Sequence, residues 1–166
     1  MRRSVRKYTG EPIADELLDK VLEAGLLSAS GRKRRPWEFV VVRNKEMLAH
    51  LAECRAAGAG MLAGADAAIV VLGQDEVADT WIEDCSIVMA NMHLAADSLG
   101  LGSCWIQGRM REAADGRLTE EYVLDALKVP QGYRLEAILS LGMPAEHAAP
   151  ATDEDLLWEK VHREVF

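Results

Sequence analysis

The chain is short of the features that mark disulfide-rich, metal-binding and membrane-spanning proteins. It holds only three cysteines among 166 residues, at positions 54, 85 and 104, and no two of them form a Cys-x-x-Cys pair. This spacing predicts neither a disulfide framework nor a zinc site, so buried, reduced thiols are expected. The apolar runs are far shorter than a membrane span and no signal peptide opens the chain, so we expect a cytoplasmic protein without membrane contacts.

Positive charge is also in deficit. Lysine and arginine number 19 against 27 acidic residues, and the resulting net charge of −8 argues against a nucleic-acid partner. The basic residues are concentrated, however, in two short windows at residues 2–7 and 32–35. Such clusters suit a compact anion such as a phosphate. Charge alone is explained more simply by two solvated basic loops.

The sequence contains none of the common catalytic templates. There is no G-x-S-x-G, P-loop, H-E-x-x-H or strand-linked G-x-G-x-x-G motif, and the four histidines have no spacing that suggests a metal site. A helical histidine such as His93 is more simply a satisfied core group than a ligand. Chemistry on a bound cofactor needs few reacting side chains, because the cofactor supplies the reactive atom. The missing templates therefore favour a cofactor-dependent reaction.

Residues 81–100 are expected to form one long helix around which the rest of the chain is arranged. Apolar residues follow a helical stripe from Trp81 to Leu99, and Ile87, Ala90 and Leu94 make the opposite side apolar as well. A helix that is apolar all round is covered at a domain centre or at a subunit boundary. Asp84 and Asn91 on this helix are candidates for internal hydrogen bonding or for exposure at its ends.

The remaining periodicities predict one domain over residues 1–166, with helices on the faces of a sheet. Residues 1–9 are expected to form an extended arm, and residues 56–64 a loop or a weak helix. Further helices are expected over residues 12–27, 44–54, 119–129 and 153–160, and strands over residues 37–42, 67–73, 103–106 and 135–141.

Four segments carry a resemblance to a known family. They read RRSVRKY at residues 2–8, SGRKRRPWEF at 30–39, GLGSCWI at 100–106 and LGMPAE at 141–146. In order and spacing they resemble the motifs of the nitroreductase family of FMN-dependent oxidoreductases. Any one segment could arise by chance, whereas four in sequence along nearly the whole chain are a specific signal.

The resemblance implies an α+β fold, a three-layer sandwich with a mainly antiparallel or mixed sheet flanked by helices. It also implies an intertwined homodimer that holds FMN at the subunit interface. Arg2, Arg3 and Ser4 would hold the phosphate and ribityl chain, and Arg6 would lie near the pyrimidine edge of the flavin. The second subunit would contribute Ser28, Ala29, Ser30 and Lys33. Backbone amides would come from Gln107 and Gly108, one of them to the hydride-accepting ring nitrogen.

Longer members of the family grip the phosphate with a late lysine–arginine pair that has no clear match here. Lys160 or His162 is the candidate to replace it, and an exposed tail explains both residues equally well. No metal is expected.

The function implied is an FMN-dependent oxidoreductase that takes a hydride from NADH or NADPH. It would pass the electrons to a small acceptor, such as a nitroaromatic, a quinone or another flavin, by a ping-pong mechanism, because the bound flavin carries the chemistry. The alternative is an FMN-binding or flavin-storage protein with little turnover. A flavin-free dimeric scaffold would leave both basic windows unexplained.

Overall fold

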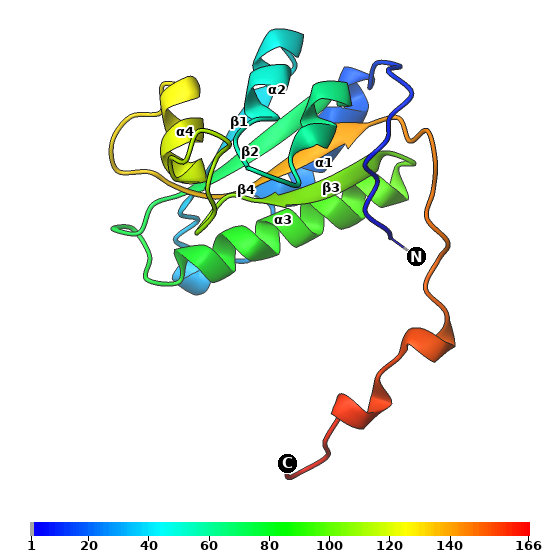
Figure 1. Cartoon of the computed structure of the whole chain (residues 1–166). Helices are drawn as coiled ribbons and strands as arrows, with labels where there is room; N and C mark the ends of the chain where they lie inside the picture. The colour runs from blue at the N-terminus through cyan, green and yellow to red at the C-terminus, as the bar shows by residue number, and fades with distance from the viewer. Residues whose placement is uncertain (1) are drawn as a thin grey trace.

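The computed structural model describes residues 2–166, which form a four-stranded sheet between two layers of helices (Figure 1). The strands are β1 (Trp37–Val42), β2 (Ala67–Gly73), β3 (Gly102–Gln107) and β4 (Arg134–Gly142), in the spatial order β1-β2-β4-β3. Each neighbouring pair is antiparallel. This confirms the expected sheet in its antiparallel form and leaves β3 as an edge strand.

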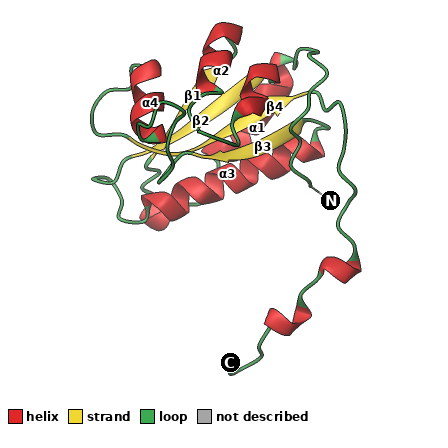
Figure 2. Cartoon of the chain, viewed as in Figure 1, coloured by secondary structure: helices red, strands yellow, loops and turns green. Residues whose placement is uncertain are grey.

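The helices are α1 (Asp15–Leu26), α2 (Lys45–Leu51), α3 (Trp81–Ser98) and α4 (Thr119–Ala126). One apolar core lies between the sheet and the layer of α1 and α3, and a second core lies between the sheet and the layer of α2 and α4 (Figure 2). β2 is buried along its whole length. Its unbroken apolar sequence follows from covering on both faces, and the predicted three-layer sandwich is confirmed.

Helix α3 begins at the predicted residue, ends two residues earlier than predicted, and leaves one side unexpectedly open. It ends where Gly100 takes a left-handed φ of +77°, a conformation that costs glycine little. Its inner side is buried in the core, as expected. On its outer side Ile87 is 42% exposed and Leu94 is 57% exposed. The helix is therefore covered by the core on one side, and its apolar stripe is exposed on the other.

Several helix boundaries differ from the expected ones. Helix α1 starts at Asp15, three residues after Pro12, and α4 ends at Ala126 because Lys128 already has a left-handed φ of 54°. The residues expected to form a helix over 153–160 form two separate 3-10 turns. A segment this short is not stable as a helix without a surface to pack on, and in Figure 1 the tail leaves the body of the chain.

The three thiols and the apolar segments behave as the sequence predicts. All three cysteines are buried and free. Burial raises the pKa of Cys85 to about 12, with a smaller contribution from the neighbouring carboxylates, so this thiol stays protonated at neutral pH. Within residues 2–166, the helices are too short or too polar to cross a bilayer.

Candidate functional site

The basic arm at the start of the chain is an ordered, extended segment. Its backbone lies between β3 and the residues that follow β4: Val5 N donates to Ser103 O at 2.9 Å, and Thr9 N donates to Met143 O at 2.9 Å. Val5 is buried, and the hydroxyl of Tyr8 reaches Ser140 Oγ at 2.7 Å. The arm expected over residues 1–9 is therefore confirmed for residues 2–9, while Met1 lies outside the described residues.

The arginines of this arm surround a hollow of about 420 Å³. We call it the arginine hollow, and its lining residues are Arg2, Arg3, Ser4, Arg6, Ala148 and Ala151. No carboxylate belongs to this lining. Over residues 2–166 the ion pairs involve none of the three arginines, whereas Lys7 pairs with Glu146 at 3.0 Å. The hollow therefore presents uncompensated positive charge, which suits a phosphate.

Behind the arginine hollow, a buried histidine holds Arg2. Arg2 Nη1 lies 2.6 Å from His93 Nε2, and His93 Nδ1 lies 2.5 Å from Ser103 Oγ. Burial, reinforced by the charge of Arg2, lowers the pKa of His93 to about 4, so the ring is neutral at physiological pH. The expected satisfied core histidine is thus confirmed, and it also touches a predicted site residue.

The far end of β3 offers one backbone donor to the open edge of the sheet. Gly108 N donates to Glu136 O at 3.1 Å, so this amide is already used. In an antiparallel pair, the amides of successive residues point to opposite sides, and Gln107 N therefore points away from β4. The side chain of Gln107 is held by Trp105 Nε1, which donates to Gln107 Oε1 at 2.9 Å. Of the two predicted amides, the geometry leaves that of Gln107 available.

A second basic segment, residues 28–35, is anchored on the other side of α3. Ser28 Oγ accepts from Asn91 Nδ2 at 2.9 Å, and Gly31 N donates to Asp84 Oδ1 at 2.8 Å. Asp84 and Asn91 are therefore internal hydrogen-bonding groups. A Cβ atom on Gly31 would lie only 2.6 Å from Thr80 Oγ1, so a larger residue would clash at this position.

The backbone of this second basic segment is strained. Arg32, Lys33 and Arg35 have left-handed φ values of 52°, 57° and 48°. Each such conformation costs a residue with a Cβ atom on the order of 1 kcal/mol. Strain of this kind persists where surrounding contacts impose it, and it is concentrated at functional sites.

The two groups of predicted residues do not meet within one chain. Arg2 contacts α3 through His93, whereas Ser28 contacts it through Asn91. Side chains two positions apart leave a helix about 200° apart around its axis, so these contacts lie on opposite sides of α3. Lys160 and His162 are exposed in the tail, which extends away from the body of the chain (Figure 1).

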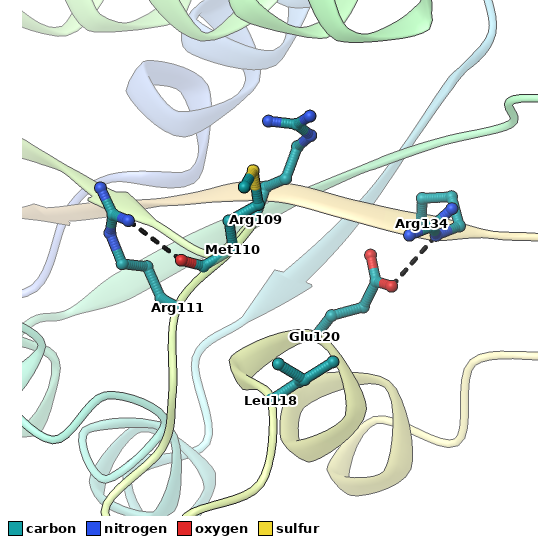
Figure 3. Close-up of a pocket in the computed structure, with 6 residues that line it drawn as sticks. All are labelled: Arg109, Met110, Arg111, Leu118, Glu120 and Arg134. Atoms are coloured by element: carbon teal, nitrogen blue, oxygen red, sulfur yellow. Dashed lines mark hydrogen bonds and ion pairs between the residues drawn. The ribbon is translucent and has the colours of Figure 1, made fainter.

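A second hollow of about 210 Å³ was not predicted from the sequence. Its lining residues are Arg109, Met110, Arg111, Leu118, Glu120 and Arg134 (Figure 3). Glu120 is the carboxylate in this lining, and it accepts from Arg134 Nε at 3.0 Å. The basic pair at positions 109 and 111, directly after Gly108, was the signal available in the sequence.

Glu136 is a further polar residue that sequence reasoning missed. It is buried on β4, where Ser86 Oγ donates to its Oε1 at 3.3 Å, and its Oε2 has no hydrogen-bond partner within residues 2–166. Burial raises the pKa of this carboxyl group. Glu136 lies in a mainly apolar strand, and nothing else in the sequence marks it as a buried carboxylate.

Comparisons with known proteins agree with this geometry. The model of the nitroreductase family matches residues 1–59 and 48–143. A relative from Archaeoglobus fulgidus, provisionally named an NADH dehydrogenase/NAD(P)H nitroreductase, is 36% identical over 98% of this chain and 93% of its own length.

Two solved structures extend the likeness to the fold. An FMN-dependent nitroreductase from Clostridium difficile R20291 is 44% identical and superposes with a TM-score of 0.97 over 99% of this chain and 96% of its own. A protein from Desulfovibrio desulfuricans, provisionally named a nitroreductase and described in complex with FMN, is 28% identical. It superposes with a TM-score of 0.81 over 99% of this chain and 93% of its own. The sequence motifs, the sandwich fold and these matches together establish that the chain belongs to the nitroreductase family.

Proposed function

We propose that this protein is an FMN-dependent oxidoreductase that takes a hydride from NADH or NADPH and reduces a small acceptor. The observation that carries the proposal is the pair of features along β3. The arginine hollow lies beside Ser103 at one end, and the free amide of Gln107 lies at the other. Four residues of strand separate these positions by about 14 Å, a span suited to an elongated phosphorylated ligand.

The residues of the arginine hollow fit the anionic end of FMN. Arg2 and Arg3 would bind the phosphate, and Ser4 would donate to it or to the ribityl chain. These two guanidinium groups have no carboxylate partner within residues 2–166, so they favour a dianion over a neutral ligand. Arg6 would lie near the pyrimidine edge of the ring, where a fixed cation stabilises the negative charge that reduction brings.

The backbone at the end of β3 fits the ring end of FMN. Gln107 N would donate to the ring nitrogen that accepts the hydride, while Gly108 N is held by Glu136 O. The fixed side chain of Gln107 keeps this amide in place before a ligand binds. A preorganised donor of this kind stabilises developing charge without a reorganisation cost.

A second copy of the chain would complete the site. The predicted contacts Ser28, Ala29, Ser30 and Lys33 lie on the opposite side of α3 from the arginine hollow, so they reach a ligand there only from a partner subunit. An apolar surface beside them supports this arrangement. It consists of Leu26, Leu27, Ile87 and Leu94, all at least 42% exposed. The tail, with Trp158 67% exposed, would wrap around the same partner.

Bound FMN supplies the group that accepts a hydride and passes electrons on. The protein contributes binding, orientation and electrostatics, in keeping with the lack of a conventional acid–base or nucleophile cluster. NADH or NADPH would stack on the exposed ring face and leave before the acceptor enters, which is a ping-pong cycle. The acceptor class we propose is a planar nitroaromatic, quinone or flavin, since such a molecule can stack in the same place.

Anaerobic stopped-flow spectroscopy tests this proposal. NADH or NADPH should bleach the flavin absorbance at a rate that saturates with nucleotide concentration, and an added quinone should restore the absorbance. A flavin that binds but is not bleached by either nucleotide would identify a flavin-storage protein instead. A chain that takes up no FMN would contradict both functions.

A further inference from the structure

The contact between Arg2 and His93 determines which nitrogen of the imidazole ring carries the proton. A guanidinium group can only donate hydrogen bonds, so His93 Nε2, which lies 2.6 Å from Arg2 Nη1, must carry the lone pair. The ring proton is therefore on Nδ1, which donates to Ser103 Oγ at 2.5 Å. With both nitrogens satisfied in this way, the imidazole is neutral.

A neutral acceptor differs from the carboxylate that commonly pairs with a half-buried arginine such as Arg2. A carboxylate at this position would hold the guanidinium equally firmly and would cancel its charge. His93 fixes the guanidinium and leaves its positive charge directed at the arginine hollow. The charged groups that influence His93 are Arg2 itself and Asp97, one turn further along α3.

Ser103 couples this contact to the rest of the arm. Its backbone oxygen accepts from Val5 N, and its hydroxyl accepts from His93. The arm is thus linked to Ser103 in two ways, directly through the backbone of Val5 and indirectly through Arg2 and His93. His93 is 6% exposed, so its ring has little freedom to leave this position.

We propose that His93 is a positioning residue that fixes Arg2 with its full charge available for the phosphate of the flavin nucleotide. This inference rests on the proposed function, because it requires the phosphate to lie in the arginine hollow. It predicts that His93 contributes to discrimination between FMN and riboflavin, which lacks the phosphate. A purely structural role would change the binding of both ligands equally.

The experiment is a competition between FMN and riboflavin on the full chain. The protein is equilibrated with mixtures of the two, and the ratio of bound flavins is measured after ultrafiltration. Arg2→Ala should lower the preference for FMN by ten- to a hundredfold, the range expected for hydrogen bonds to a charged group. His93→Leu should lower it about tenfold, since Arg2 loses its fixed position.

Two further substitutions separate position from charge. In His93→Gln, the amide oxygen can accept from Arg2 without adding charge, so the preference for FMN should stay within about threefold of the wild type. In His93→Glu, the carboxylate would hold Arg2 and cancel its charge, so the preference should fall as far as in Arg2→Ala. His50→Gln is the matched control, since His50 lies on α2 against Tyr122, and it should change nothing.

The outcomes distinguish this inference from the proposed function. If Arg2→Ala lowers the preference while His93→Leu and His93→Glu leave it unchanged, the role of His93 is wrong and the proposed function stands. If Arg2→Ala itself has no effect, Arg2 does not bind the phosphate and the inference fails, whereas a wild-type chain that takes up neither flavin would contradict the proposed function. Equal losses of FMN and riboflavin binding in the His93 variants would show a merely structural residue and overturn the inference.

Discussion

Arg6 differs from Arg2 in having no hydrogen bond to the interior within residues 2–166, and it is an exposed residue in the lining of the arginine hollow. Arg6→Ala should lower the affinity for FMN on the order of tenfold and make the reduction potential more negative, because the reduced flavin loses a nearby cation. Potentiometric titration and fluorescence quenching measure the two effects. Arg163→Ala, in the exposed tail, is the control that should do neither. Equal effects from both variants would show that Arg6 is not a site residue.

The buried imidazole of His93 also makes stability depend on pH. Its folded pKa of about 4 lies below the ordinary value of 6.5, so the unfolded chain takes up its proton first as the pH falls. The free energy of unfolding should therefore decrease by about 3 kcal/mol between pH 6.5 and pH 4 on account of this residue alone.

Urea denaturation of the wild type and His93→Gln at both pH values measures this loss. Glu136 contributes in the opposite direction, since burial raises its pKa, but it is present in both proteins and cancels from the difference. A wild-type stability that falls in parallel with that of His93→Gln would mean that the histidine is not held neutral.

At the scale of single elements, the strained backbone of residues 28–35 is the feature most open to test. Lys33 has a φ of 57°, which glycine adopts without cost. Lys33→Gly and Lys33→Ala remove the same ammonium group, but only glycine relieves the backbone. Lys33→Gly should therefore be more stable than Lys33→Ala by about 1 kcal/mol. Thermal or urea unfolding of the flavin-free chains measures the difference, and equal stabilities would contradict a strained conformation at this residue.

The sequence predicted which segments form helices and strands, but it did not predict all of the residues at which they end. Strand 37–42 and strand 67–73 were predicted to the residue, because branched and apolar side chains stop sharply at both ends of each strand. The end of α4 was predicted from Pro130, but the helix already stops at Ala126. Nothing in the local composition signals the left-handed Lys128 that ends it.

The sequence motifs indicated the residues of the candidate site itself. They did not indicate the supporting residues outside the motifs, such as His93 and Glu136. The arginines of the arm were found because they form a dense basic window. The link of His93 to Arg2 was missed, since it joins residues 91 positions apart and depends on how the arm lies against β3. The same holds for Glu136, whose burial follows from the packing of α3 on β4.

For the whole molecule, the proposal requires two copies of the chain. Leu94, on the open side of α3, is 57% exposed. Leu94→Asp would place a charge in the proposed interface, so it should convert the dimer to a monomer and lower flavin affinity, although no residue of the arginine hollow has changed. Size-exclusion chromatography with light scattering measures the mass. Leu118→Asp, which alters an exposed leucine on another surface, should leave both properties unchanged.

If Leu94→Asp lowers the mass and the flavin affinity stays the same, the site is complete within one chain. That result would remove the partner from the site and leave Ser28, Ala29, Ser30 and Lys33 without a role in binding. A mass that stays dimeric would instead place the interface elsewhere.

The most direct measurement of the account is sedimentation of the wild-type protein, followed through the visible absorbance of the flavin. We expect the yellow species to sediment as a dimer, at twice the chain mass of 18.2 kDa, with one FMN per chain. Flavin that sediments with a single chain, or a dimer that binds no FMN, would contradict the account.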